Sequence, residues 1–234
     1  MNNEQFKKFE NRIEYNFKDY ELLKLALTHS SYGNEVYHDK LHNNERLEFL
    51  GDAVLEVTVS EFLFNNYPDM PEGELTKLRA SIVCEPTLAI CARQIGLDKI
   101  IFLGKGEEMT GGRFRDSITS DAFEALIGAI FLDGGIECAT GFVEKFVLQD
   151  IDNKKLFVDS KSILQERIQA GYKNGPEYFL IGESGPDHCK EFSVEVRLEG
   201  KVIGTGKGRT KKAAEQKAAY DAIINMQTKN TITG

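Results

Sequence analysis

Acidic side chains at helical spacing are the residues of this sequence best placed to do chemistry. The segment from residue 44 to 66 carries acids at steps of three, four and four: Glu45, Glu48, Asp52 and Glu56. At about 3.6 residues per turn, these acids lie along one stripe of a helix. Like charges at this spacing repel by about 0.2–0.5 kcal/mol per pair, so water, a basic partner or a metal ion must offset the repulsion.

A second acidic pair lies in a much more apolar segment. Asp121 and Glu124 are three residues apart, and the residues around them are Ala122, Phe123 and 125–127, all apolar. If the two helices pack together, four carboxylates converge: Glu48, Asp52, Asp121 and Glu124. Such an all-oxygen site suits Mg²⁺, with Mn²⁺ as a substitute, and does not suit zinc. A magnesium ion held by carboxylates keeps waters, and such a site can hydrolyse a phosphodiester. Spacing alone leaves a second interpretation open, in which both helices are ordinary amphipathic helices with solvated acids.

Basic residues gather near the C-terminus, where a predicted strand meets a predicted helix. They are Lys207, Arg209, Lys211 and Lys212. The N-terminus of the helix adds unpaired N–H groups and the positive end of its dipole. The group is interpreted as a phosphate clamp, although a solvated charged turn remains the alternative.

Two further stretches complete a predicted nucleic-acid surface. One is the loop 185–188, which contains His188, and the other is a helix face that bears Ser162, Gln165 and Glu166. Three contacts at such separations suit duplex RNA, which modules of this kind recognise across two minor grooves by shape. Double-stranded RNA is therefore the expected partner.

The remaining pattern supplies the elements that must position these residues. Helices are predicted at about 44–66, 72–94, 117–134 and 136–148, with a loop at 104–112 and a short strand at 99–103. After a polar stretch, the pattern changes to a helix at 160–173, strands at 178–182, 191–198 and 201–207, and a helix at 211–225. An α-β-β-β-α order in about 70 residues is typical of a compact α+β module.

Charge and composition narrow the classes of function. The net charge is −8. Residues 1–158 carry 27 acids and 17 bases, residues 159–228 carry 10 acids and 11 bases, and Lys229 adds the last charge, so that −10 + 1 + 1 = −8. The first part thus suits metal cations. No apolar run is long enough to span a membrane and no signal peptide is visible, so a cytoplasmic protein without a membrane partner is expected. The glycines at 204–208 lack phosphate-loop spacing, so no nucleotide cofactor is expected.

Several motifs resemble those of bacterial ribonuclease III. The segment Asn44–Leu55 resembles the signature of that family, and Asp121–Gly128 resembles its second acidic motif. Further matches are Leu27–Tyr32 and Pro71–Leu75 in the first part, and Leu164–Glu166, Gly185–His188 and Lys211–Ala214 in the second. The resemblance implies an all-α ribonuclease III endonuclease domain at 1–150, a linker at 151–158, and an α+β double-stranded RNA-binding domain at 159–228.

The resemblance also implies roles for individual residues. The implied metal ligands are Glu48, Asp121, Glu124 and Asp52, with Asp52 and Glu124 also catalytic. Glu72 would support a second metal ion. Phe49 would lie in the interface of a homodimer, although a phenylalanine in the core fits the sequence equally well.

The resulting hypothesis is a divalent-metal-dependent endoribonuclease specific for double-stranded RNA. Its products would be 5′-phosphate and 3′-hydroxyl ends with short 3′ overhangs, and its tasks rRNA precursor processing and mRNA turnover. Two alternatives are a protein that holds RNA duplexes without cutting them and a metalloprotein that acts on small molecules.

Overall fold

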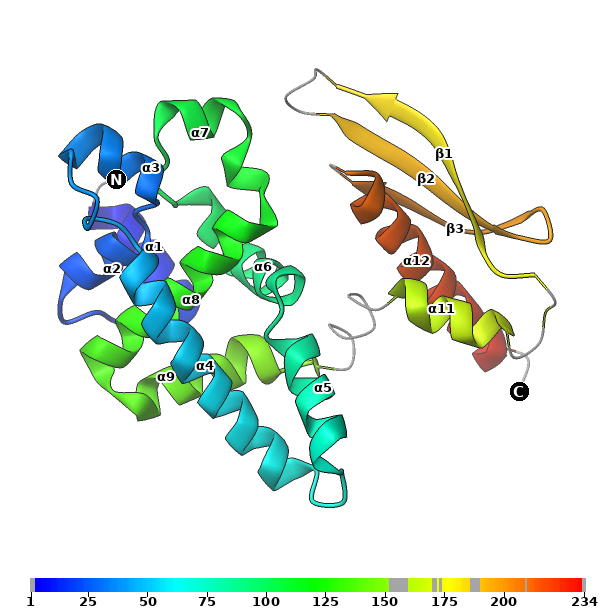
Figure 1. Ribbon diagram of the computed structural model, residues 1–234, viewed down its shortest axis with the longest axis horizontal. Coiled ribbons are helices and arrows are strands. Elements are labelled where there is room, and N and C mark those ends of the chain that lie inside the picture. Colours follow the sequence, from blue (N-terminus) through cyan, green and yellow to red (C-terminus); the bar gives the residue numbers. More distant parts are fainter. Residues whose placement is uncertain are drawn as a thin grey trace. The chain divides into compact units, whose positions relative to one another are not determined.

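The chain divides into two compact units, Met1–Ile151 and Asp152–Gly234, called the N-terminal and the C-terminal unit below (Figure 1). The computed structural model describes residues 3–151, 160–169, 172, 174–185, 190–208 and 210–232. The predicted linker therefore lies, apart from Ile151, outside the described residues, and the domain boundaries at 150 and 159 stay predictions.

The N-terminal unit is helical. Among its described residues, β-type pairing is limited to an isolated bridge between Thr28 and Phe102. Its elements are α1 (Asn3–Ile13), α2 (Tyr20–Ala26), α3 (Ser30–Tyr32), the π-helical η1 (Gly33–Tyr37), α4 (Glu45–Asn66), α5 (Glu72–Ile82), α6 (Glu85–Gln94), η2 (Leu97–Lys99), α7 (Lys105–Met109), η3 (Gly112–Phe114), α8 (Asp116–Gly134), α9 (Ile136–Val143) and the π-helical η4 (Glu144–Leu148).

Helix α8 forms the centre of this unit. Most of its apolar side chains are buried, and Phe123, Leu126 and Ile127 are completely so. It packs against α2, α4, α6 and α9, which surround it in Figure 1. A helix that is apolar on nearly all sides can be stable only in such a buried position. Asp121 and Glu124 of α8 are thereby half-buried.

Two glycines let α4 and α8 cross at backbone distance. A Cβ atom at Gly51 would lie 1.8 Å from the carbonyl oxygen of Glu124, and one at Gly128 would lie 2.3 Å from that of Leu47. No other residue fits at either position unless the helices move apart. This contact brings the acidic turns of the two helices together.

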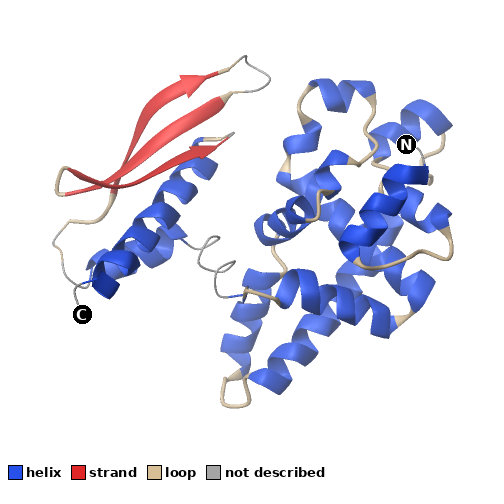
Figure 2. Cartoon of the chain, turned by 180° about the vertical axis from the view of Figure 1, so that it is seen from behind, coloured by secondary structure: helices blue, strands red, loops and turns tan. Residues whose placement is uncertain are grey.

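The C-terminal unit is a three-stranded antiparallel sheet with two helices. Its elements are α11 (Ser160–Gln169), β1 (Glu177–Ser184), β2 (Glu191–Leu198), β3 (Lys201–Gly208) and α12 (Lys211–Ile232), and the strand order is β1-β2-β3. Both helices cover the same face of the sheet (Figure 2). Gly204 and Gly206 of β3 permit this, because a Cβ at either would lie within 2.4 Å of an α12 carbonyl oxygen. The predicted α-β-β-β-α order is confirmed.

Three details of the predicted elements are wrong. The helix at 72–94 is two helices, because Pro86 would clash with the carbonyl of Ile82 in a continuous helix. The loop at 104–112 contains α7, whose Glu107 and Glu108 pair with Arg115 and Arg113. The strand at 99–103 is reduced to the single bridge at Phe102. A proline decides the first case, whereas contacts with distant residues act on the other two, from Glu35 to Lys105 at the start of α7 and from Thr28 to Phe102.

The other helices lie close to their predicted ranges. Those at 44–66 and 117–134 correspond to α4 and α8. The helix at 136–148 is α9 followed by the π-helical η4, and the one at 160–173 is α11, which ends at Gln169. The last helix extends beyond residue 225 to Ile232.

Candidate metal centre

Three of the predicted carboxylates form one group in the N-terminal unit. Glu48 of α4 and Asp121 and Glu124 of α8 each offer an oxygen, and these oxygens lie within 4.8 Å of one another. All three side chains are half-buried. The spacings along α4 and α8 thus place acids at the crossing of the two helices, where the glycines allow close approach.

Asp52 lies at the rim of this group. Its side chain is exposed and one turn further along α4 than Glu48. Its negative charge acts on the pKa of both Glu48 and Glu124, which shows that it is close to them. Glu48, Asp52, Asp121 and Glu124 are called the four-carboxylate cluster below.

Burial and mutual repulsion make the cluster difficult to ionise. Burial, followed by the charge of Asp52, raises the pKa of Glu124 to about 8. Burial, followed by the charge of Asp121, raises the pKa of Glu48 to about 7. The pKa of Asp121 is also raised, mainly by burial. A divalent cation would reverse these shifts, because it favours the charged form of every carboxylate around it.

The donor set fits a hard divalent cation. The ligand atoms are carboxylate oxygens alone, which are the ligands of Mg²⁺ and Mn²⁺. Within the described part of the chain, no lysine or arginine forms an ion pair with any member of the cluster. The negative charge is therefore left for a cation to balance.

We expect the pH dependence of stability to reveal this cluster. The pKa values of Glu48 and Glu124 in the folded chain lie above the ordinary 4.5, so the native state holds more protons than the unfolded state up to about pH 8. Without metal, the free energy of unfolding should therefore fall as the pH rises through this window. Thermal unfolding in EDTA measures it.

Glu124→Gln is the control for this measurement, because an amide does not titrate. The free energy of unfolding should fall less steeply with pH in Glu124→Gln than in the unaltered chain. At high pH, added Mg²⁺ should restore the stability of the unaltered chain but not that of Glu124→Gln. Equal slopes for the two proteins would contradict the assignment of the raised pKa to Glu124.

Two other predicted residues of the N-terminal unit have different surroundings. Glu72 begins α5, is exposed, accepts a hydrogen bond from Thr76 at 3.0 Å and is not part of the three-oxygen group. Its role at a second metal ion stays a prediction. Phe49 is 81% exposed, so the alternative that it is a core residue is wrong. Val57 and Phe64 continue an exposed apolar stripe along α4, at 58% and 75% exposure.

The predicted RNA-binding residues lie on α11 and around the start of α12. Ser162 and Glu166 of α11 are exposed and Gln165 is half-buried. Lys207, Lys211 and Lys212 are exposed, and two of them pair loosely with acids, Lys207 with Glu191 and Lys211 with Glu183, both at 3.9 Å. Thr210 caps α12 by accepting the N–H of Ala213 at 3.0 Å. His188 and Arg209 lie outside the described residues.

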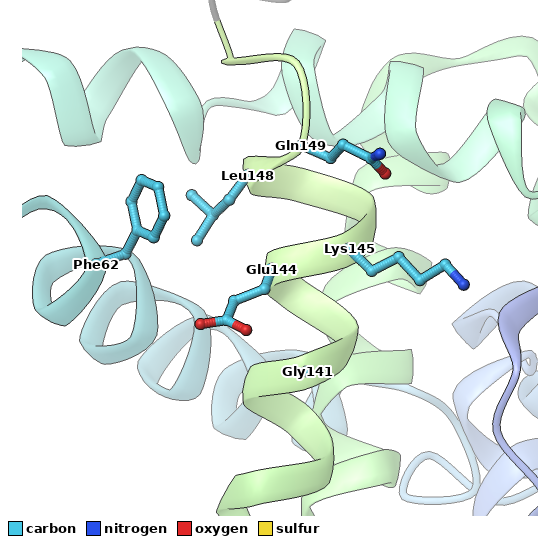
Figure 3. Close-up of a pocket in the computed structure, with 6 residues that line it drawn as sticks. All are labelled: Phe62, Gly141, Glu144, Lys145, Leu148 and Gln149. Carbon is cyan, nitrogen blue, oxygen red and sulfur yellow. The ribbon is translucent and has the colours of Figure 1, made fainter. Parts of the chain in front are cut away.

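A shallow hollow elsewhere on the N-terminal unit does not coincide with the cluster. Figure 3 shows Phe62 of α4 facing Leu148 and Glu144 of η4, and Gly141, Lys145 and Gln149 also line the hollow. One acid and one base line it, so it lacks the group of carboxylates that a divalent cation needs. None of the predicted site residues contributes to it.

The sequence reasoning assigned no role to the two glycines of the helix crossing or to His29. The close approach of α4 and α8 at Gly51 and Gly128 has no signature in either helix taken alone. His29 lies within electrostatic range of Asp121. Its position inside the motif Leu27–Tyr32 is the one feature of the sequence that could have indicated a role for it.

Among the described residues, no helix is long and apolar enough to cross a membrane.

Comparisons with known proteins agree with this geometry. A family described as Ribonuclease-III-like matches residues 19–151, and the double-stranded RNA binding motif matches residues 160–226. Ribonuclease 3 of Bacillus licheniformis is 50% identical over 226 residues, which cover 96% of this chain and 91% of that protein. Ribonuclease 3 of Staphylococcus haemolyticus is 47% identical over 98% of this chain and 94% of its own length.

Solved structures resemble the N-terminal unit. The nuclease domain of ribonuclease III from Campylobacter jejuni matches with a TM-score of 0.58 and 43% identity, and the match covers 64% of this chain and 97% of that domain. A second structure of the same domain, with a TM-score of 0.57, 44% identity and coverage of 61% and 96%, concerns flexibility in a region involved in dimer formation.

Proposed function

Since the chain belongs to the ribonuclease III family and is an endoribonuclease specific for double-stranded RNA, we propose that the four-carboxylate cluster is the metal centre that hydrolyses RNA phosphodiesters. The observation that carries the proposal is the convergence of three carboxylate oxygens within 4.8 Å at the α4–α8 crossing. The proposed ion is Mg²⁺, which Mn²⁺ can replace.

The four acids have different roles in this proposal. Glu48, Asp121 and Glu124 hold the ion, and Asp52 with Glu124 is catalytic. When bound, the cation supplies stabilisation of charge on the phosphate and a water of lowered pKa. Glu124 gives up the proton that burial favours when the cation binds. Asp52, which is exposed at the rim, accepts a proton from the attacking water or orients it. Glu72 supports a second ion.

The C-terminal unit binds the duplex in this proposal. The exposed side chains of α11 contact 2′-hydroxyl groups, while the lysines beside the N-terminus of α12 contact phosphates. Hydrolysis leaves 5′-phosphate and 3′-hydroxyl ends with short 3′ overhangs. The proposed tasks are rRNA precursor processing and mRNA turnover, both of which take place in the bacterial cytoplasm.

Cleavage of a long RNA duplex tests the function directly. The chain should cut with Mg²⁺, and the products should carry the 5′-phosphates that adapter ligation requires. With Ca²⁺, whose coordination is looser and larger, it should bind the duplex without cutting. Tight binding without cutting under Mg²⁺ and Mn²⁺ would leave a duplex-binding protein as the function.

The proposed assembly is a homodimer that meets along the apolar stripe of α4, which consists of Phe49, Val57 and Phe64. These side chains are largely exposed in one chain, and burying an aromatic side chain contributes about 1.5–3 kcal/mol. A twofold dimer also provides one metal centre for each strand of a duplex.

We expect Phe49→Asp to weaken dimerisation roughly 100-fold, because it removes an aromatic side chain from the proposed interface and places a charge there. Sedimentation velocity over a concentration series measures the dissociation constant. Met109→Asp is the control, because Met109 is 77% exposed but lies on α7, away from the stripe. A Phe49→Asp chain that sediments as the unaltered protein does would rule out this interface.

A further inference from the structure

His29 is fixed next to the helix that carries Glu48. Its backbone N–H donates to the carbonyl of Phe102 at 3.1 Å. The preceding carbonyl, that of Thr28, accepts the N–H of Asn44 at 2.8 Å, directly before α4 begins. The backbone of His29 is therefore held between the Phe102 segment and the start of α4.

Two hydrogen bonds set the tautomer of the His29 ring. Its Nδ1 atom accepts the backbone N–H of Ser31 at 3.2 Å, so Nδ1 carries no proton when the ring is neutral. The Oγ atom of Ser31 lies 2.8 Å from the same nitrogen and accepts the N–H of Gly104 at 2.9 Å, so the hydroxyl proton of Ser31 points to Nδ1. The proton of a neutral ring is therefore on Nε2.

The surroundings keep this ring neutral and near the metal centre. Burial lowers the pKa of His29, against the opposing charges of Glu107, Asp121 and Glu45. The ring does not belong to the group of ligand atoms within 4.8 Å of one another. Within the described ranges, no hydrogen-bond acceptor for Nε2 is found. An oriented N–H donor thus lies within electrostatic range of an anionic site, and among the described residues it has no acceptor.

Phosphate is the acceptor that best fits this donor. The carboxylates repel a phosphate that enters the site. A hydrogen-bond donor at the edge of the site, if it has no other acceptor, offsets part of this repulsion. Arg115 is the cation whose charge acts on His29, but it is already paired with Glu107 at 2.5 Å. The Nε2–H of His29 has no such competing partner among the described residues.

We propose that His29 donates its Nε2–H to a non-bridging phosphate oxygen of the RNA strand bound at the four-carboxylate cluster. This inference rests on the proposed function of the cluster. It makes His29 a residue that contacts the substrate from the helical unit, in addition to the surface of the C-terminal unit. It also explains why the Ser31–Gly104 contacts fix one tautomer.

Two substitutions of His29 separate this contact from a structural role. His29 caps α3 through Nδ1, and an asparagine oxygen can accept the same Ser31 N–H but cannot supply a donor at the position of Nε2. A glutamine amide can reach the position of Nε2 but caps poorly. We expect His29→Asn to keep the melting temperature and lose about 10-fold to 100-fold in single-turnover cleavage rate, as for a hydrogen bond to a charged group. His29→Gln should recover most of the rate despite a lower melting temperature.

A sulfur-for-oxygen scan of the substrate identifies the contact itself. Single phosphorothioates are placed near the cleaved bond, and rates in Mg²⁺ are compared for the unaltered chain and His29→Asn. At one position, sulfur should slow the unaltered chain about 10-fold and leave His29→Asn unaffected, because that variant has no donor to lose. Identical sulfur penalties in both proteins at every position overturn the proposal, as does a His29→Asn chain that cleaves at the normal rate. Failure of the unaltered chain to cleave would instead reject the proposed function.

Discussion

Glu124→Gln abolishes cleavage of duplex RNA, with an expected loss of about 10³-fold or more, while binding of the duplex persists. Glutamine keeps the shape of the side chain but removes one of the three negative charges whose oxygens lie within 4.8 Å. The cation then loses a ligand and part of the field that holds it. Single-turnover cleavage in Mg²⁺ measures the first effect.

Retained binding is the second half of this result. The proposed RNA contacts lie on α11 and near the start of α12, so duplex affinity measured in Ca²⁺ should change by no more than about threefold. Glu137→Gln is the matched control, because Glu137 is exposed on α9. The Glu137→Gln protein should cleave duplex RNA at the normal rate. Parallel loss of binding and cleavage in Glu124→Gln would point to misfolding and contradict the assigned role.

Gly51→Ala separates the two acidic helices and so costs both stability and activity. The added Cβ would lie 1.8 Å from the carbonyl oxygen and 2.6 Å from the carbonyl carbon of Glu124, and the backbone of α8 cannot rotate away. Overpacking of this kind costs about 1–3 kcal/mol, against about 0.5–1 kcal/mol gained from the helix propensity of alanine. We expect a lower melting temperature and, since a shift of about 1 Å can cost about 10²-fold in rate, a comparable loss of cleavage.

Gly141→Ala is the control for this experiment. Gly141 lies within α9, and a Cβ there would meet nothing within 4 Å. Its replacement should raise stability slightly and leave the rate unchanged. If Gly51→Ala melts and cleaves as Gly141→Ala does, the close crossing is not what positions the carboxylates.

Local patterns in the sequence predicted most of the elements correctly. Acids at steps of three and four indicated the stripe on α4, and a buried helix around Asp121 followed from its apolar neighbours. Alternation indicated the three strands, and the order α-β-β-β-α is confirmed. These features depend on residues close in sequence, because periodicity and propensity act over a few positions. The errors at Pro86 and at α7 arose where contacts from distant segments or a proline changed the local preference.

The sequence by itself determined which acids this protein possesses and how they are spaced along each helix. Only the tertiary structure decided that α4 and α8 meet at Gly51 and Gly128, because the space beside a glycine depends on the backbone that crosses it. The raised pKa values of Glu48 and Glu124 follow from that crossing, since burial and neighbouring charges come from the partner helix. The exposure of Phe49 likewise depends on packing, because the opposite face of α4 is the one that packs into the core. Spacing is a property of one helix, whereas burial and convergence are properties of two.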